Sequence, residues 1–223
     1  MATTPDTKTT TVEAGKPVDR IEIGRIASER ILIPIIGTMP LIMCKFPEKA
    51  RRAMLDAMQG RKAPKAVRDP QADFEAAMWR LKDGFGFPSV AFKSATIGAA
   101  RYYGKAVSMT ELRQLIFFRG ELSADTPPQA LVRLDCDEPT MREDYVRIGQ
   151  TTDLRYRPEF NNWSAVLDVT FVTSSLSRES LLSLVDAGGM GGVGEWRPAG
   201  KKSTGDFGTY AIDQTKEIEV IST

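Results

Sequence analysis

The sequence predicts an α+β protein built around an antiparallel sheet. Three observations predict this class: helix-period segments lie between residues 47 and 115, alternating strand-like segments follow at short spacing, and the chain ends in the order strand, helix, strand. A chain of 223 residues is long enough for one large domain that buries about 70% of its unfolded surface. We therefore expect a single domain over residues 21–223 after a disordered tail over residues 1–20.

The N-terminal part of the chain is a polar tail followed by apolar strands. Residues 1–20 are rich in Thr, Lys and Asp and show no hydrophobic period, so we assign them no structure. Residues 21–46 are rich in Ile and are interrupted by two prolines and a glycine, which predicts one or two strands. The run 31–36 is apolar on both faces, as expected of a central strand covered on each side or of a strand in a subunit contact.

Residues 45–105 form a basic helical insertion. They contain 13 Lys and Arg against 6 Asp and Glu, a local charge of +7, whereas the whole chain carries +1. Helices are expected over residues 47–59 and 70–81, the second with a buried apolar stripe. The loop between them is rich in proline and cations, which leaves its charges free to meet a polyanion, although a solvated charged surface is the alternative. Its candidate binding residues are Arg61, Lys62, Lys65 and Arg68.

The segment 84–104 is a candidate site for a phosphate group. Two glycines and Pro88 prevent a regular element before Ser89, and the apolar residues that follow recur at spacings of three and four. Ser89 is therefore expected to cap a helix, with Lys93 one turn later. A lysine near free backbone N–H groups and the positive end of a helix dipole favours an anion, although such a turn and lysine are also common without any ligand.

The middle of the chain turns to strands after a short helix that begins at Ser108, where Glu111 completes a capping box. Alternation within residues 143–150 places Tyr145 on one face together with Arg147. In the next strand it places Arg155 and Arg157 together, and both are candidates for contacts with a polyanion. The expected strands cover residues 115–122, 129–139, 143–150, 153–160 and 163–174.

The C-terminal section contains a helix capped by Ser177, a glycine-rich run over residues 188–194 and a last strand near residues 207–212. Five glycines in seven residues allow a backbone to approach a ligand closely, and a flexible hairpin is the alternative. The run lacks the Gly-Lys-Ser/Thr of a phosphate-binding P-loop, and it follows a helix where a dinucleotide-binding fingerprint would follow a strand.

Composition excludes several kinds of chemistry. The chain has no histidine, which removes Ser-His and Cys-His catalysis and most zinc sites. Its two cysteines have no metal-binding spacing and favour a reduced, cytoplasmic location. We find no membrane-spanning run, no signal peptide and no enzyme motif of high specificity. We therefore expect a non-enzyme without cofactor, metal site or membrane partner.

The order of these segments resembles the repeat-associated mysterious protein superfamily, which includes the backbone subunits of CRISPR effector complexes. The resemblance covers roughly residues 31–212. FPSVAFKSA matches the family's proline- and lysine-bearing segment at Pro88, Phe92 and Lys93, and GGMGGVGEWRP matches its glycine-rich loop at Gly192 and Gly194. The resemblance implies a ferredoxin-like fold, the fold of RNA-recognition modules, and subunits that polymerise along a guide RNA. Because the superfamily's nucleases commonly rely on histidine, it implies no nuclease activity here.

These observations lead to one functional expectation with two alternatives. We expect a non-catalytic, sequence-tolerant binder of single-stranded RNA or DNA, RNA being favoured, that acts as a homo-oligomer or within a larger complex. Lys201 and Lys202 would extend the path of Arg155 and Arg157 along the strand. The alternatives are a self-assembling phage structural protein and a protein-interaction module that mimics a subunit of a defence complex.

Overall fold

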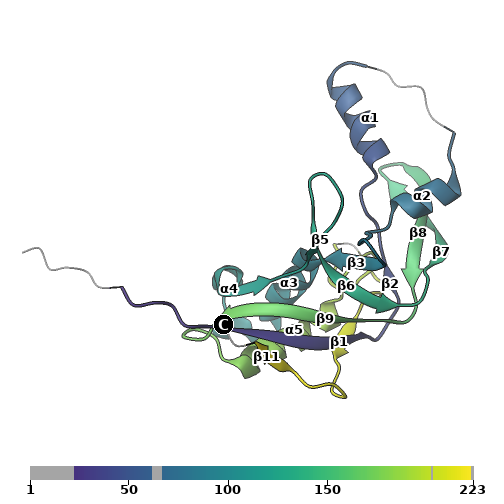
Figure 1. Cartoon of the computed structure of the whole chain (residues 1–223). Coiled ribbons are helices and arrows are strands. Elements are labelled where there is room, and N and C mark those ends of the chain that lie inside the picture. The colour runs from purple at the N-terminus through teal and green to yellow at the C-terminus, as the bar shows by residue number, and fades with distance from the viewer. Residues whose placement is uncertain (1–22, 62–66, 202, 222–223) are drawn as a thin grey trace, which may run out of the picture.

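The computed structural model describes residues 23–61, 67–201 and 203–221 (Figure 1). The protein is α+β with antiparallel sheets, as the sequence predicts. The tail expected over residues 1–20 lies outside the described residues, and so do Lys62, Lys65 and Lys202 of the candidate binding residues. No helix within the described ranges is long and apolar enough to cross a membrane.

The larger sheet has eight strands, all paired antiparallel. They are β1 (Ser28–Gly37), β3 (Phe85–Pro88), β4 (Ile116–Phe118), β5 (Glu121–Leu122), β6 (Ala130–Cys136), β9 (Trp163–Val172), β10 (Tyr210–Ile212) and β11 (Glu219–Ile221). The main order is β10-β1-β9-β6-β3. β11 also pairs with β1, β4 with the C-terminal half of β9, and β5 with β6. The Ile-rich segment is therefore a central strand, as expected.

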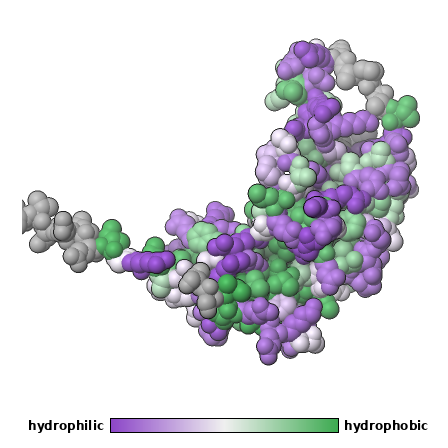
Figure 2. Space-filling model, in the orientation of Figure 1, coloured by the Kyte–Doolittle hydropathy of each residue, from purple (hydrophilic) through white to green (hydrophobic). Residues whose placement is uncertain are grey.

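One face of this sheet is covered by helices and the other is open. α3 (Ser89–Gly98) and α5 (Arg178–Gly191) pack against each other behind the sheet in Figure 1. The covered face includes Ile31, Ile33 and Ile35, which are fully buried. On the open face about half of Ile36 and of Val166 is exposed, and Figure 2 shows hydrophobic residues over β1 and β9. The described residues therefore cover the second face of this strand only in part, at Pro34 but not at Ile36, and the alternative of a strand in a subunit contact stays a prediction.

A second, three-stranded sheet and two helices form the other end of the molecule. The strands are β2 (Leu41–Ile42), β7 (Thr140–Ile148) and β8 (Thr151–Phe160), in the order β2-β8-β7. α2 (Pro70–Ala76) packs on β8 and is shorter than the helix predicted over residues 70–81. Phe74 of α2 is buried as predicted, and so are Ala77, Met78 and Leu81, which follow the helix. α1 (Glu48–Met58) projects from the body in Figure 1, and none of its eleven residues is buried. We call residues 45–61 the arm.

α3 is shorter than predicted, and the next α-helix begins at the predicted cap. α3 ends at Gly98, and the chain continues as a 3₁₀ helix over residues 99–106 rather than as α-helix to Tyr103. α4 (Met109–Leu115) is capped by Ser108, whose hydroxyl accepts a hydrogen bond from the backbone N–H of Glu111 at 3.4 Å. The capping box therefore identified this helix start correctly.

The glycine-rich run is helical for its first half, which corrects the prediction of a flexible loop. α5 continues through Gly188 and Gly189 to Gly191, and only then does the chain turn. A Cβ at Gly188 would lie 2.9 Å from the carbonyl carbon of Ala95 in α3. These glycines therefore allow the two helices to approach closely, and packing compensates for their low helix propensity.

Candidate functional site

Two cavities lie side by side at the base of the arm, and Cys44 lines both of them. The first has a volume of about 560 Å³ and lies between the start of α3 and residues 191–199; we call it the glycine-loop cavity. The second has a volume of about 780 Å³ and lies between α1, α2 and β8; we call it the arm cavity. Cys44 lies between the two cavities, and we call the two cavities together the binding groove.

The glycine-loop cavity brings together the two segments singled out by the sequence. The cavity is lined on one side by Pro88, which precedes α3, and by Val90, Ala91 and Ser94 of α3. Gly192 and Gly194 line it as well. Both glycines have a positive φ, 67° and 80°, which side-chain-bearing residues rarely adopt. A Cβ at Gly194 would also lie 2.5 Å from the carbonyl oxygen of Ile42, so glycine permits this loop to pass close to β2. Arg101 and Arg197 add positive charge to the cavity, and Glu195 adds negative charge.

Two predicted residues of α3 have different surroundings from those expected. Ser89 is the first residue of the helix and is buried, while Pro88 takes the cap position and no side chain caps the helix. The reason is that β3 continues to Pro88 and the helix starts immediately after it. Lys93 donates a hydrogen bond to the carbonyl oxygen of Arg113 at 3.0 Å and lies over the ring of Phe117, so its ammonium group already has internal partners.

The arm cavity is lined by more positive than negative side chains. Its cations are Lys45, Lys49, Arg68, Arg155 and Arg157, and its carboxylates are Asp73 and Asp153. The positive charges come from the arm on one side and from β8 on the other. A cationic groove of this kind attracts polyanions, because its walls concentrate the positive potential.

Several of these cations are held by carboxylates, and for Arg68 this corrects the prediction that the charges of the basic loop are free. Arg68 donates hydrogen bonds to Asp73 at 3.0 Å and to Asp153 at 2.5 Å, and Arg155 lies 3.1 Å from the same Asp153. The hydrogen bond from Arg68 holds the pKa of Asp153 below its usual value. Because Asp153 follows Arg68 by 85 residues, the local charge count could not show this pairing.

Two further predicted cations, Arg61 and Lys201, lie outside the binding groove. Arg61 is exposed and lies 4.0 Å from Asp56 of α1, and Lys201 is exposed beyond the glycine-rich loop. Neither lines a cavity.

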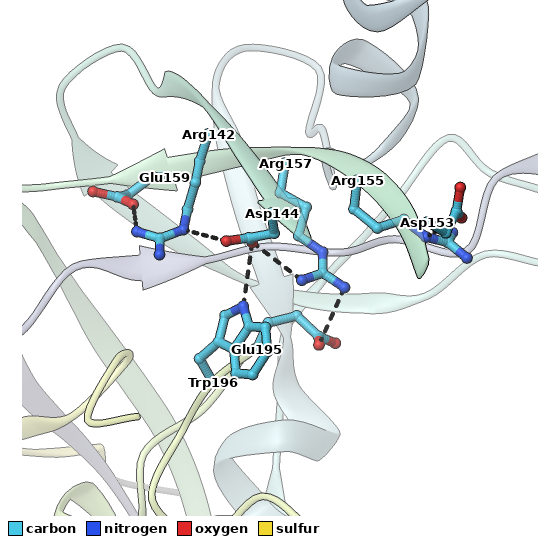
Figure 3. A network of polar contacts seen from close by, with 8 residues as sticks. All are labelled: Arg142, Asp144, Asp153, Arg155, Arg157, Glu159, Glu195 and Trp196. Carbon is cyan, nitrogen blue, oxygen red and sulfur yellow. Dashed lines mark hydrogen bonds and ion pairs between the residues drawn. The ribbon is translucent and has the colours of Figure 1, made fainter. Parts of the chain in front are cut away.

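A network of polar contacts connects β7, β8 and the glycine-rich loop (Figure 3). At its centre the buried carboxylate of Asp144 accepts hydrogen bonds from Arg142 at 2.7 Å, from Arg157 at 3.2 Å and from the indole N–H of Trp196 at 3.2 Å. Arg157 also lies 3.6 Å from Glu195. Burial alone would raise the pKa of Asp144, but the hydrogen bonds from Arg142 and Trp196 outweigh it and hold this pKa below its ordinary value.

This network corrects the role predicted for Arg157. The alternation of β8 places it on the same face as Arg155, and both line the arm cavity as that pattern predicts. The side chain of Arg157 is only 8% exposed, however, because β8 packs there against the glycine-rich loop and the guanidinium group is turned toward Asp144. Arg157 is therefore a buried wall residue rather than a free phosphate ligand.

Sequence reasoning missed Asp144 and Trp196 as partners. The alternation that exposes Tyr145 implies that Asp144 points to the opposite, buried face, and this signal was available. The contact of Asp144 with Trp196 joins residues 52 positions apart, and no local pattern indicates it. Within the described ranges no group of three or more Cys, Asp or Glu side chains could hold a metal ion.

Comparisons with known proteins find similarity among solved structures but not in sequence. No protein-family model matches the sequence, and no curated protein matches it. Among solved structures, the chain is similar to one in the Type III-B Cmr-beta complex bound to cognate target RNA, with a TM-score of 0.40 and 9% sequence identity. The similarity covers 87% of this chain and 61% of that chain. At this level it identifies no shared activity.

Proposed function

We propose that the protein is a non-catalytic, sequence-tolerant binder of single-stranded nucleic acid, RNA being preferred, and that the strand lies in the binding groove. The observation that carries the proposal is the adjacency of the two cavities, which share Cys44 as a lining residue and have an excess of cations along their walls. Proteins that bind single-stranded nucleic acid without sequence preference usually have a positively charged groove along the phosphate backbone and aromatic side chains on which the bases stack. Trp79 and Tyr102 line the glycine-loop cavity, and Tyr156 lines the arm cavity.

The core of the larger sheet supports a ferredoxin-like assignment within this proposal. In that fold two strand-helix-strand units form an antiparallel sheet in the order 4-1-3-2, with both helices on one face. Here β1, α3 and β4 with β6 supply the first unit, and β9, α5 and β10 supply the second. The observed order β10-β1-β9-β6 corresponds to 4-1-3-2. β3 and the second sheet are then additions to this core.

Binding of a labelled strand tests the proposal directly. We expect fluorescence anisotropy to show binding of a 30-nucleotide RNA, weaker binding of the matching DNA, and loss of affinity as salt rises. The double reversal Lys49→Glu with Arg155→Glu changes both walls of the arm cavity and should weaken binding at least tenfold. Lys82→Glu with Lys105→Glu makes the same charge change at exposed positions outside both cavities and should have a much smaller effect. Equal losses in the two pairs would contradict the groove assignment.

A self-assembling structural protein is the second candidate, because two apolar surfaces are exposed. The arm presents Met54, Leu55 and Met58, and the open sheet face presents Ile36 and Val166. A short helix that buries nothing is marginally stable by itself, which favours a partner on the arm. Purification without nuclease separates the candidates. A large particle with a protein-like 260/280 nm absorbance ratio and no affinity for RNA would support the structural protein.

A further inference from the structure

Asp144 contacts one residue from the wall of the arm cavity and another whose two chain neighbours line the glycine-loop cavity. On one side it holds Arg157, which lines the arm cavity. On the other side it holds Trp196, whose neighbours Glu195 and Arg197 line the glycine-loop cavity. Figure 3 shows these side chains converging on the one carboxylate from β8 and from the glycine-rich loop. The two walls therefore share a single anchor.

The backbone at Trp196 indicates that this anchor carries strain. Trp196 has a φ of 55°, the one positive value found at a non-glycine position in the described part of the chain. A bulky residue in the left-handed region is uncommon, and such a conformation persists only where its surroundings impose it. The hydrogen bond from the indole to Asp144 is such a restraint. With the indole turned toward Asp144, the flanking residues 195 and 197 line the cavity.

Arg157 has little freedom to find another partner. Its side chain is buried, and its Nε lacks a hydrogen-bond partner among the described residues. Its other contact, with Glu195, again joins the arm cavity to the glycine-rich loop. A shift of the loop would therefore change the position of Arg157, and a shift of Arg157 would change the loop, through both Asp144 and Glu195.

We propose that Asp144 is a positioning residue that couples the two cavities, so that a strand seated in one cavity strengthens binding in the other. This inference rests on the proposed function. It assigns no ligand contact to Asp144 itself. When the strand contacts one wall, it holds that wall and the hydrogen-bonded Asp144 in position. The second wall is then already ordered when the next part of the strand binds.

A double-mutant cycle measures this coupling. Arg101→Ala removes a cation from the glycine-loop cavity, and Arg155→Ala removes one from the arm cavity; the ion pair of Arg155 is with Asp153, not Asp144. In the otherwise native protein, the fold-loss of affinity for the 30-nucleotide RNA should not multiply. We expect the loss in the double variant to be at least fivefold smaller than the product of the losses in the two single variants. In the Asp144→Asn background we expect the losses to multiply within about twofold, the tolerance for independent sites.

Trp196→Phe provides a second variant if Asp144→Asn fails to fold. It removes the indole N–H that reaches Asp144 and leaves the bonds from Arg142 and Arg157 in place, so the cycle in this background should also become multiplicative. The inference is overturned if the affinity losses of Arg101→Ala and Arg155→Ala already multiply in the otherwise native protein. It is also overturned if the coupling between these two losses is unchanged in both the Asp144→Asn and the Trp196→Phe backgrounds. A native protein that binds no strand would instead refute the proposed function, so the two failures are distinguishable.

Discussion

Replacing Gly188 by alanine tests the close contact between α3 and α5, which supports one wall of the binding groove. Alanine is favoured over glycine inside a helix by about 1 kcal/mol. A Cβ at this position, however, would lie 2.9 Å from the backbone carbon of Ala95 and 2.9 Å from the backbone nitrogen of Thr96. Both are main-chain atoms of a packed helix, so the helices must separate, and overpacking of this kind costs about 1–3 kcal/mol. After the propensity gain is subtracted, we expect the free energy of unfolding to fall by about 1 kcal/mol and by no more than about 2 kcal/mol.

Gly98→Ala is the matched control, because it makes the same change near the end of α3. The nearest atom to its Cβ would be a guanidinium nitrogen of Arg101, 3.9 Å away, and the backbone is helical there. This variant should be unchanged or more stable by up to about 1 kcal/mol. Urea unfolding followed by circular dichroism measures both variants. The packing argument fails if Gly188→Ala is as stable as the native protein or as Gly98→Ala.

Three further predictions concern charged residues. Arg157→Ala leaves the buried Asp144 with Arg142 and Trp196 as its remaining partners and should lower the free energy of unfolding by about 1.5–3 kcal/mol, measured by urea unfolding. Lys82→Ala should change it by less than about 0.5 kcal/mol. The pKa of Asp144 is lower in the folded protein than its ordinary value of 3.8, so the unfolded chain takes up its proton first. Stability should therefore decline as the pH falls through 3.8 toward the folded value, and Asp144→Asn should show a smaller decline in the same titration. Lys62→Glu with Lys65→Glu should weaken RNA binding without lowering the melting temperature, and unchanged affinity would remove the loop from the binding surface.

The sequence predicted those parts of the fold that depend on local pattern. The apolar stripe of residues 70–81 and the capping box at Ser108 both identified elements that the structure contains. The glycine-rich run was predicted wrongly because glycine weakens a helix by itself, and only contact with α3 shows why Gly188 is tolerated. The sequence contains no local sign of such a contact.

Much of the candidate site depends on contacts between distant residues, which limits what a local pattern can predict. The sequence singled out the start of α3 and the glycine-rich run, and the structure places both on one cavity, although Ser89 and Lys93 themselves do not line it. It could not show that Arg68 pairs with Asp153 or that Arg157 is turned toward Asp144. A count of local charges treats every cation as free, but folding selects partners from across the chain.

This pairing has a measurable consequence for salt dependence. Six phosphate contacts would give a slope of log K against log salt of roughly −4 for a single strand. In the structure the two cavities carry seven cations and three carboxylates along their walls, an excess of four. Because a cation already paired with a carboxylate releases fewer counterions on binding, we expect a slope of about −3. A slope of about −4 or steeper would show that cations outside the groove share the phosphate contacts, with the exposed Arg61 and Lys201 the first to test by charge reversal.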